Sequence, residues 1–322
     1  MKIVIIGPGE MRIPPKSWGA VEILIDDYRK TLQKLGNEVY IVNSKDPNIM
    51  AFVCNSIKPD VVHIQYDNHV GIAKYLDCDF IIATSHYGYL EHPQKWSSGY
   101  SDIFWGFVNS KAKIFCLSKG IKDMYKKAGV PDERLFVVPN GVRTDLFSFK
   151  STCKFPDRSL CLGKIDFRKR QHILQDIESL WFVGNYEDNR FRKNHERWLG
   201  PWKKTELYEN LTDYSNLVLL SDGEAHPLVC MEALSSGLGL VVSEAASAKL
   251  DTTRDFIDVI PNEQMNNLDY IEKIIETNRK KSNSLREEIR KYAIEFHDWN
   301  FVIKNKYMNL IENLTKEGPC LT

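Results

Sequence analysis

Two glutamates eight residues apart are the side chains best suited to chemistry in this sequence. Glu224 closes the polar segment Ser221-Asp-Gly-Glu224, and Glu232 follows Pro227-Leu-Val-Cys-Met. Pro227 is a typical first residue of a helix and Gly237 a typical stop, which predicts a short helix between them. Glu224 then precedes this helix, and Glu232 lies just over one turn inside it. The two carboxylates could bind one elongated ligand along the helix N-terminus; alone, they could also be a cap and a surface charge.

Lysines follow a second expected strand, near residues 159–163. Gly163-Lys164 ends that strand, and Lys169 follows five residues later within Arg168-Lys-Arg170. Ammonium groups on such a loop are suited to neutralise a diphosphate leaving group, whose charge grows as its bond to a sugar breaks. The alternative is an ordinary solvated basic loop.

In the first half of the chain, small residues also stand after an expected strand and at the start of an expected helix. Gly7-Pro-Gly9 follows the first strand, and Trp18-Gly-Ala-Val-Glu22 opens the first helix. Gly19 would let a phosphate or a sugar approach backbone amides at the helix N-terminus. A dinucleotide-binding fingerprint is disfavoured, because the third glycine is missing and no helix begins directly after the motif.

One histidine follows a strand end in the same half. His86 comes just after the strand expected at 79–84. It could donate a hydrogen bond to a sugar hydroxyl, although a single histidine at a strand end is more often structural. His63, within Asp60-Val-Val-His-Ile-Gln65, is expected to be buried in the sheet.

Spacings typical of metal sites are missing from the sequence. The eight histidines make no H-x3-H or H-E-x-x-H pattern, and the seven cysteines make no C-x-x-C pair and are expected to be reduced thiols. Asp77-Cys-Asp79 imitates a metal-binding D-x-D motif, but it precedes a strand rather than following one. We therefore expect no metal and no other cofactor.

Short β-rich runs alternate with amphipathic segments along the whole chain, which is typical of parallel sheets with crossover helices. The fold class expected is α/β, with two Rossmann-like, doubly wound parallel-sheet domains and a cleft between them. In the first half, strands are predicted near 2–6, 38–42, 60–65, 79–84, 113–117 and 135–138, and helices near 19–35, 47–57, 70–76, 101–109 and 119–128.

A break at Phe147–Pro156 separates the two series of elements. The domains expected are 1–150, 151–296 and a C-terminal helix in 297–322 that crosses back to the first domain. After the break, strands are predicted near 159–163, 180–183, 216–220, 238–242 and 257–260, and helices near 171–178, 204–213, 228–236, over the periodic stretch 267–296, and from the Trp299 segment to about 315.

Composition narrows the function classes. The 322 residues include 43 Lys plus Arg and 43 Asp plus Glu, so nucleic-acid binding through charge alone is disfavoured. Apolar runs stay far below the roughly 20 residues of a membrane-spanning helix, and the opening apolar run is too short for a signal-peptide core. We expect a cytoplasmic protein without a transmembrane segment, either a monomer or a homodimer.

Together these segments resemble the retaining nucleotide-sugar glycosyltransferases of the GT-B fold, glycosyl transferases group 1 or family 4. Glu224 and Glu232 are similar to the family's paired glutamates, Gly163-Lys164 with Lys169 to its basic pair, Trp18-Gly-Ala-Val-Glu22 to its N-terminal loop and Ser85-His86 to its donor-facing histidine. Val138-Pro-Asn-Gly-Val142 resembles the stretch that ends the first domain, and the Trp299 segment resembles the last helix.

The resemblance implies roles for these residues. Glu224 would contact the donor sugar, Glu232 the ribose, and Lys164 with Lys169 the diphosphate, with His86 and Gly19 across the cleft. The chemistry implied is front-face substitution in which the leaving phosphate helps to deprotonate the acceptor hydroxyl. The catalytic residues expected are Glu224, His86 and Lys169, and the donor-binding residues are Gly19, Lys164, Lys169, Glu224, Pro227, Leu228, Val229 and Glu232.

Three positions depart from the family pattern. Lys164 stands where arginine is commoner, so that a bidentate phosphate clamp becomes a point charge. Pro227 has no amide N–H to offer to the sugar or phosphate. Gly19-Ala20 replaces a pair of glycines and narrows the room beside the phosphate.

The acceptor is left open by the sequence. Aromatic residues of the first half suit glycan stacking as well as core packing, and a glycan or a small molecule is expected, with a base in DNA disfavoured. A sugar-nucleotide epimerase and a non-catalytic sugar-nucleotide or glycan-binding subunit are the alternatives to a transferase. The aromatic residues of the first half that suit glycan stacking are Tyr66, Tyr87, Tyr89, Trp96, Tyr100 and Trp105.

Overall fold

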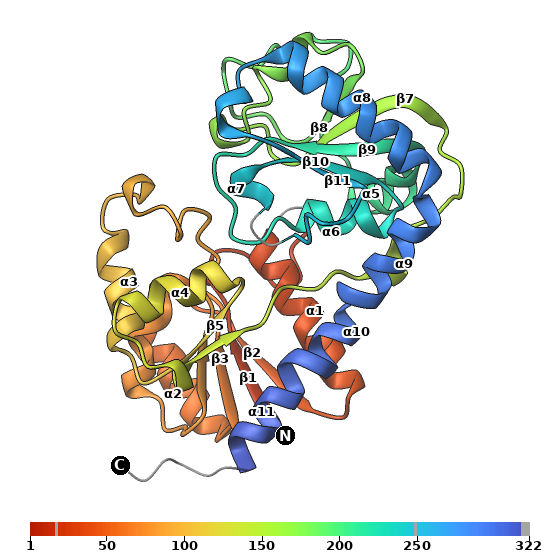
Figure 1. Cartoon of the computed structure of the whole chain (residues 1–322). Coiled ribbons are helices and arrows are strands. Elements are labelled where there is room, and N and C mark those ends of the chain that lie inside the picture. Colours follow the sequence, from red (N-terminus) through yellow and green to blue (C-terminus); the bar gives the residue numbers. More distant parts are fainter. Residues whose placement is uncertain (17–18, 248–249, 317–322) are drawn as a thin grey trace. The chain divides into compact units, whose positions relative to one another are not determined.

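A computed structural model describes residues 1–16, 19–247 and 250–316. The described chain divides into two units, each with one parallel sheet (Figure 1). The first unit contains Met1–Asn140 and the C-terminal segment that starts at Trp299, and the second unit is Gly141–Asp298. The α/β class and the two doubly wound sheets predicted from the sequence are confirmed.

The first unit is built on a six-stranded sheet in the order β2-β1-β3-β4-β5-β6. All neighbours are parallel, so the carboxyl ends of the strands lie at one edge. The central strands are covered on both faces, and the side chains from Ile3 to Ile6 are fully buried. The strands are β1 (Lys2–Ile6), β2 (Glu38–Val42), β3 (Val61–Ile64), β4 (Ile81–Ala83), β5 (Lys113–Cys116) and β6 (Leu135–Val137).

Local capping explains where two helices of this unit begin. Asp46 accepts hydrogen bonds from the amides of Asn48 and Ile49 at the start of α2, and Ser118 accepts from Ile121 at the start of α4. The helix predicted near 70–76 is present as a longer 3₁₀ segment, η1 (Asp67–Tyr75). The α-helices are α1 (Ala20–Lys34), α2 (Pro47–Ile57), α3 (Tyr100–Asn109) and α4 (Lys119–Lys127), and further 3₁₀ turns are η2 (Pro93–Lys95) and η3 (Asp132–Arg134).

The C-terminal segment packs on the first unit. It runs through α10 (Trp299–Val302), a π-helical turn η9 (Ile303–Met308) and α11 (Asn309–Lys316). The Trp299 ring lies 4.8 Å from the Tyr28 ring of α1, and the Tyr307 ring stacks 5.5 Å from that of His63 in β3. Aromatic contacts therefore hold this segment against the first unit, where α10 and α11 are labelled in Figure 1.

The second unit has a five-stranded parallel sheet in the order β11-β10-β9-β7-β8. Two apolar clusters, one on each face, bury its central strands. Because all neighbours are parallel, the loops that follow β7, β8, β9 and β10 meet at one edge. The strands are β7 (Phe155–Leu162), β8 (Leu180–Val183), β9 (Tyr214–Leu219), β10 (Gly239–Ser243) and β11 (Ile257–Ile260).

The long periodic stretch forms two helices that meet at Leu285. Just after this break, the buried Arg286 donates hydrogen bonds to the carbonyls of Lys150, Thr212 and Tyr214, which ties α9 to the rest of the unit. The helices of this unit are α5 (Lys204–Asn210), α6 (Leu228–Ser235), α7 (Glu244–Ser247), α8 (Leu268–Ser284) and α9 (Arg286–Phe296), with 3₁₀ turns η4 (Thr144–Leu146), η5 (Phe167–Lys169), η6 (Leu174–Asp176), η7 (Leu211–Asp213) and η8 (Asn262–Gln264).

The helix predicted at 171–178 is wrong. The segment contains only the short turn η6, whose backbone bonds span three residues, as from the amide of Leu174 to the carbonyl of Gln171, instead of the four of an α-helix. Two of its polar side chains bond to backbone outside it. Gln171 donates to the carbonyl of Lys164, and Gln175 both donates to the carbonyl and accepts from the amide of Arg192.

The segment between 141 and 150 packs within the second unit. The amide of Ser148 donates to the carbonyl of Tyr208, and Phe147 joins the apolar cluster on one face of the second sheet. The change of unit at Asn140–Gly141 thus comes ten residues before the boundary expected at 150.

Candidate active site

Lys169 lies against the backbone that follows β7. Gly163 has a φ of +123°, which favours glycine, and a Cβ placed there would lie 2.4 Å from Lys169 Nζ. Among the described residues, no carboxylate lies within ion-pair distance of this ammonium group. The positive charge at the edge of the sheet is therefore available to an anionic ligand.

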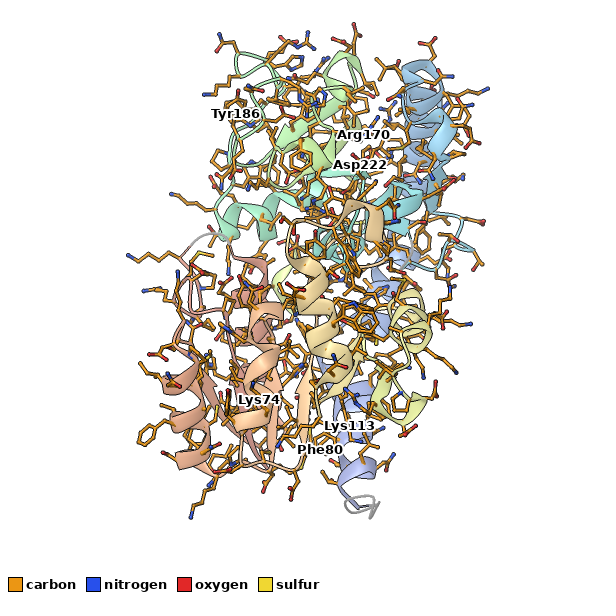
Figure 2. The ribbon with its side chains drawn as sticks, turned by 90° about the vertical axis from the view of Figure 1, so that its left-hand side faces the viewer. Lys74, Phe80, Lys113, Arg170, Tyr186 and Asp222 are labelled. Atoms are coloured by element: carbon orange, nitrogen blue, oxygen red, sulfur yellow. The ribbon has the colours of Figure 1, made fainter. Side chains whose placement is uncertain are left out.

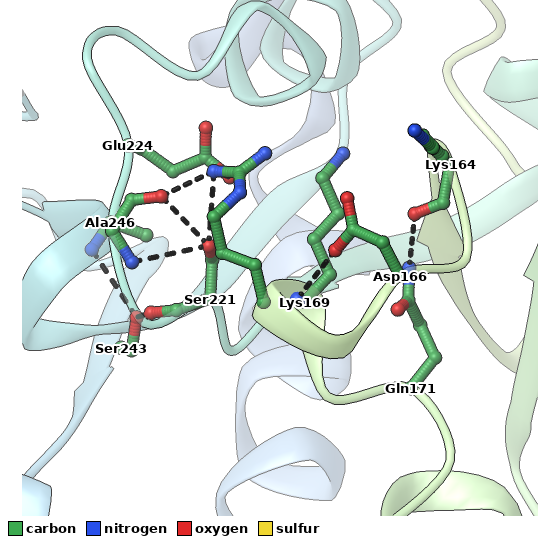
Figure 3. A network of polar contacts seen from close by, with 10 residues as sticks. Lys164, Asp166, Lys169, Gln171, Ser221, Glu224, Ser243 and Ala246 are labelled. Atoms are coloured by element: carbon green, nitrogen blue, oxygen red, sulfur yellow. Dashed lines mark hydrogen bonds and ion pairs between the residues drawn. The ribbon is translucent and has the colours of Figure 1, made fainter. Parts of the chain in front are cut away.

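Arg168 is a residue of the site whose role the sequence analysis missed. Its guanidinium lies 2.8 Å from the Glu224 carboxylate and also donates to Ser221 Oγ and to the carbonyl of Gly223. Figure 3 shows Ser221 and Glu224 in this network of polar contacts. The amide of Asp222 in turn donates to the carbonyl of Arg168. The Arg168-Lys-Arg170 run was the available signal, but which of its cations meets Glu224 depends on the pairing of β7 with β9.

The third cation of this run supports the same loop. Arg170 Nη1 lies 3.7 Å from the Asp222 carboxylate, and the two residues are labelled together in Figure 2. Arg170 also donates to the carbonyl of Met265 and the side chain of Asn266. It therefore fastens the loop to the fold, whereas Arg168 and Lys169 extend toward the Glu224 loop and Gly163.

Cys230, in the first turn of α6, senses the charges of the predicted site. Burial raises the pKa of the Cys230 thiol, the charges of Glu224 and Glu232 raise it further, and Lys169 lowers it. Pro227 is the buried N-cap residue of α6 and offers no N–H. Leu228 and Val229 follow as the half-buried first residues of the helix, and Glu232 is half-buried one turn further on.

Lys164 has a different environment from Lys169. Its ammonium pairs with Glu187 at 2.6 Å, and both side chains are largely exposed. The two residues line a cavity of about 530 Å³ with Asp166, Asp188 and Arg190. Contact between Lys164 and a diphosphate would therefore compete with the Glu187 carboxylate.

In the first unit, His86 is held on two sides. Its amide donates to Asp67 Oδ1 at 3.0 Å, and its ring Nε2 lies 2.7 Å from Gln65 Oε1. Burial lowers the pKa of His86 to about 4, so the ring is neutral at pH 7. The hydrogen bond to a sugar expected from His86 therefore cannot use Nε2 without breaking the bond to Gln65.

A cavity of about 400 Å³ opens beside His86. Asp67 lies in its wall as a buried carboxylate that accepts hydrogen bonds from Ser85 Oγ and from the Tyr100 hydroxyl. Tyr66 and Tyr87 also line it, and the described residues of the lining include no lysine or arginine. A cavity with this lining suits a neutral ligand rich in hydroxyl groups.

Gly19 precedes α1 with a φ of +130°. A Cβ there would lie 2.8 Å from the carboxylate of Glu22 and 3.0 Å from Met11, so the position needs glycine. Trp18, which completes the predicted loop, lies outside the described residues. His63 is fully buried in β3, as expected.

The searched part of the chain, residues 1–16, 19–247 and 250–316, holds no group of three or more His, Cys, Asp or Glu arranged for a metal ion. Asp77 and Asp79 precede β4, at the opposite end of that strand from His86. In the same part of the chain, none of the helices combines the length and the apolar character needed to cross a membrane.

Comparison with known proteins gives a family match to part of the chain. Residues 48–146 match the model described as Glycosyltransferase Family 4. A search of curated proteins found no match.

Solved structures match almost the whole chain. HepE of Anabaena, solved in complex with UDP-glucose, is 14% identical, with a TM-score of 0.72 over 98% of this chain and 100% of that one. Sucrose-phosphate synthase from Thermosynechococcus elongatus is 13% identical, with a TM-score of 0.76 over 98% and 100%. AviGT4, a glycosyltransferase involved in avilamycin A biosynthesis, is 14% identical, with a TM-score of 0.72 over 98% of each chain.

The two parallel-sheet units and these matches define the class of protein: the chain has the GT-B fold. Identities of this size show the fold alone. The match of residues 48–146 to Glycosyltransferase Family 4 covers less than a third of the chain, and it agrees with the class of the proteins that share this fold.

Proposed function

We propose that this protein is a glycosyltransferase that moves a sugar from a nucleoside diphosphate to an acceptor hydroxyl with retention of the anomeric configuration. The acceptor proposed is a glycan or a small molecule. The observation that carries the proposal is the Lys169 ammonium beside Gly163, together with the Arg168–Glu224 pair at the same edge of the sheet. Lys169 is available to an anionic ligand, and the Glu224 carboxylate is held in place by Arg168.

The roles proposed follow from these environments. Lys169 and the amides at the start of α6 stabilise the charge that develops on the diphosphate as the glycosidic bond breaks. Glu224, oriented by Arg168, accepts hydrogen bonds from hydroxyls of the donor sugar. Glu232 contacts the ribose, and Leu228 and Val229 border the nucleotide.

The chemistry proposed needs neither a protein nucleophile nor a metal. The acceptor hydroxyl attacks the anomeric carbon from the side of the departing diphosphate, the bond from that carbon to the diphosphate oxygen breaks, and the acceptor proton passes to that oxygen. Lys169 supplies the positive charge that a divalent ion supplies in other transferases.

The donor is proposed to be a UDP-sugar as the first choice, because HepE was solved with UDP-glucose. Protection against thermal unfolding by a panel of UDP-, GDP- and ADP-sugars tests this choice, since a bound ligand stabilises the folded state by mass action. Turnover of the protecting donor then separates the alternatives. A transferase consumes it only with an acceptor, an epimerase changes the sugar alone, and a binding subunit leaves it unchanged.

A further inference from the structure

A chain of buried side chains runs from His86 into the first unit. His86 Nε2 lies 2.7 Å from Gln65 Oε1, and Gln65 Nε2 lies 3.2 Å from His63 Nδ1. His63 continues the chain, with Nε2 at 2.8 Å from Thr84 Oγ1 and Nδ1 at 3.2 Å from the Tyr307 hydroxyl. Gln65 and His63 have no exposed surface, so these polar atoms depend on one another for hydrogen bonds.

The donors and acceptors in this chain fix where the ring protons lie. An amide oxygen only accepts and an amide nitrogen only donates, and a neutral imidazole has one N–H and one bare nitrogen. Gln65 Oε1 therefore requires a proton on His86 Nε2. Gln65 Nε2 requires a bare Nδ1 on His63, whose proton then lies on Nε2 and points to Thr84.

Turning the Gln65 amide around would reverse every bond of the chain. The Tyr307 hydroxyl would then face a protonated His63 Nδ1 and lose its acceptor in a fully buried position. In the orientation that the Gln65 amide has in the structure, Thr84 Oγ1 accepts from His63 Nε2. The Thr84 hydroxyl proton then has no acceptor within this series of hydrogen bonds. A phenol is the stronger donor of the two and costs more to leave unpaired, which favours the orientation observed.

We propose that Gln65 is a positioning residue that holds His86 as the Nε2–H tautomer, leaving Nδ1 as a bare acceptor for a hydroxyl proton of the substrate in the cavity lined by His86. The tautomer rests on the contacts above and on the orientation of the Gln65 amide, which also hydrogen-bonds the Tyr28 side chain, and its use by a substrate rests on the proposed function. His86 thus accepts from the ligand, instead of donating to it as its type alone suggested. A hydroxyl-rich ligand supplies the donor that this acceptor needs.

Asp67 completes the support of His86. It accepts from the backbone amide of His86 while Gln65 accepts from the ring, so both the backbone and the plane of the imidazole are fixed. The ionisable groups that face His86 are Asp67 across the cavity, His63 beyond Gln65, and the hydroxyls of Tyr66, Tyr87 and Tyr100. Asp67 brings the one negative charge of this set, and it is engaged by Ser85 and Tyr100.

Long-range ¹H–¹⁵N correlation spectra of ¹⁵N-histidine-labelled protein at pH 7.5 test the tautomer directly, with His86→Asn used to assign the signal. The proposal predicts a pyrrole-type Nε2 and a pyridine-type Nδ1 for His86. A predominantly protonated Nδ1 in the wild type would overturn it, whether or not the protein transfers sugar.

Two substitutions of Gln65 test the positioning. Gln65→Met removes the acceptor at similar volume, and we expect a mixed His86 tautomer and a fall in kcat of roughly 10-fold to 100-fold with little change in the donor KM. Gln175→Met is the matched control, because Gln175 is also fully buried but belongs to the second unit and bonds to Arg192 rather than to His86. It should leave the His86 signal unchanged and keep kcat within about 3-fold.

Gln65→Glu keeps an acceptor for Nε2–H but adds a negative charge. The charge should raise the pKa of His86, so activity relative to wild type should fall as pH decreases from 7.5 to 5.5, where protonation removes the bare Nδ1. An unchanged tautomer in Gln65→Met would overturn the role of Gln65. A mixed tautomer with unchanged kcat would show that transfer does not use His86, without contradicting sugar transfer itself.

Discussion

Arg168 and Glu224 lie 56 positions apart in the chain and form an ion pair of 2.8 Å at the carboxyl edge of the second sheet. Both side chains are mostly buried, with 23% and 12% of their surface exposed. The pair fixes the direction of the carboxylate, because the guanidinium is itself held by Ser221 and Gly223. Glu224 is thus oriented before any ligand arrives.

Removing this orientation should slow transfer more than it weakens nucleotide binding. For Arg168→Met we expect a fall in kcat of about 100-fold, since the carboxylate would lose its fixed geometry. The unfolding free energy should also fall by about 1–3 kcal/mol, because Glu224 remains partly buried without its partner. Arg192→Met, which removes an exposed pair with Asp176, is the control and should change neither quantity measurably. A kcat like wild type for Arg168→Met would show that the pair is only structural.

Lys169 should carry much of the affinity for the diphosphate. A charge-assisted contact contributes roughly 1.5–3 kcal/mol, so Lys169→Ala should weaken the binding of nucleoside diphosphate by one to two orders of magnitude. Calorimetric titration with UDP and GDP measures this, with Lys280→Ala on α8 as a control that removes an exposed lysine. Equal affinities in wild type and Lys169→Ala would identify the 168–170 loop as an ordinary solvated loop.

Substitutions of Glu224 and of Glu232 should have different effects on turnover and on nucleotide affinity. Glu224→Gln should lose turnover while nucleotide affinity stays near that of wild type, because the role proposed for Glu224 lies at the sugar. Glu232→Ala should instead weaken nucleotide binding by about 10-fold, the effect of one lost hydrogen bond. Weaker nucleotide binding by Glu224→Gln, together with a lower kcat but unchanged affinity for Glu232→Ala, would contradict the roles proposed.

Two buried histidines predict a loss of stability in mild acid. Burial lowers the pKa of His63 to about 3 and that of His86 to about 4, from an ordinary 6.5. Below pH 6.5 the unfolded chain binds protons that the folded chain does not bind until about pH 4 or lower. The unfolding free energy should therefore fall as pH decreases from 6.5 to 4. Urea denaturation at pH 7.5, 6 and 5 measures this, and a midpoint that stays constant over this range would contradict the buried neutral state.

Strands and most helices could be predicted from the sequence because their apolar pattern is continuous. The strands at 2–6, 180–183 and 257–260 have the bounds expected. The segment 171–178 has the same kind of pattern, but it forms only the turn η6, with Gln171 and Gln175 bonded to backbone outside it. Such bonds depend on which loops lie next to one another in the fold. The apolar periodicity of a sequence does not predict this.

The candidate site residues were selected on similar grounds, and their roles remain predictions. Glu224, Lys169 and His86 could be selected because they follow strands, and the parallel sheets bring strand ends together. The partners Arg168 and Gln65 could not be assigned, because the first depends on β7 lying beside β9 and the second on β3 lying beside β4. Strand order, rather than residue type, decides these pairs.

The anomeric configuration of the product tests the central claim most directly. An α-linked nucleotide sugar should be incubated with the protein, an acceptor and excess chelator, and the first product analysed by proton nuclear magnetic resonance before it can mutarotate. The account predicts an α-linked product at an undiminished rate, because Lys169 and the amides of α6 supply the charge that stabilises the leaving group. A β-linked product, or activity lost in chelator and restored by manganese, would contradict it.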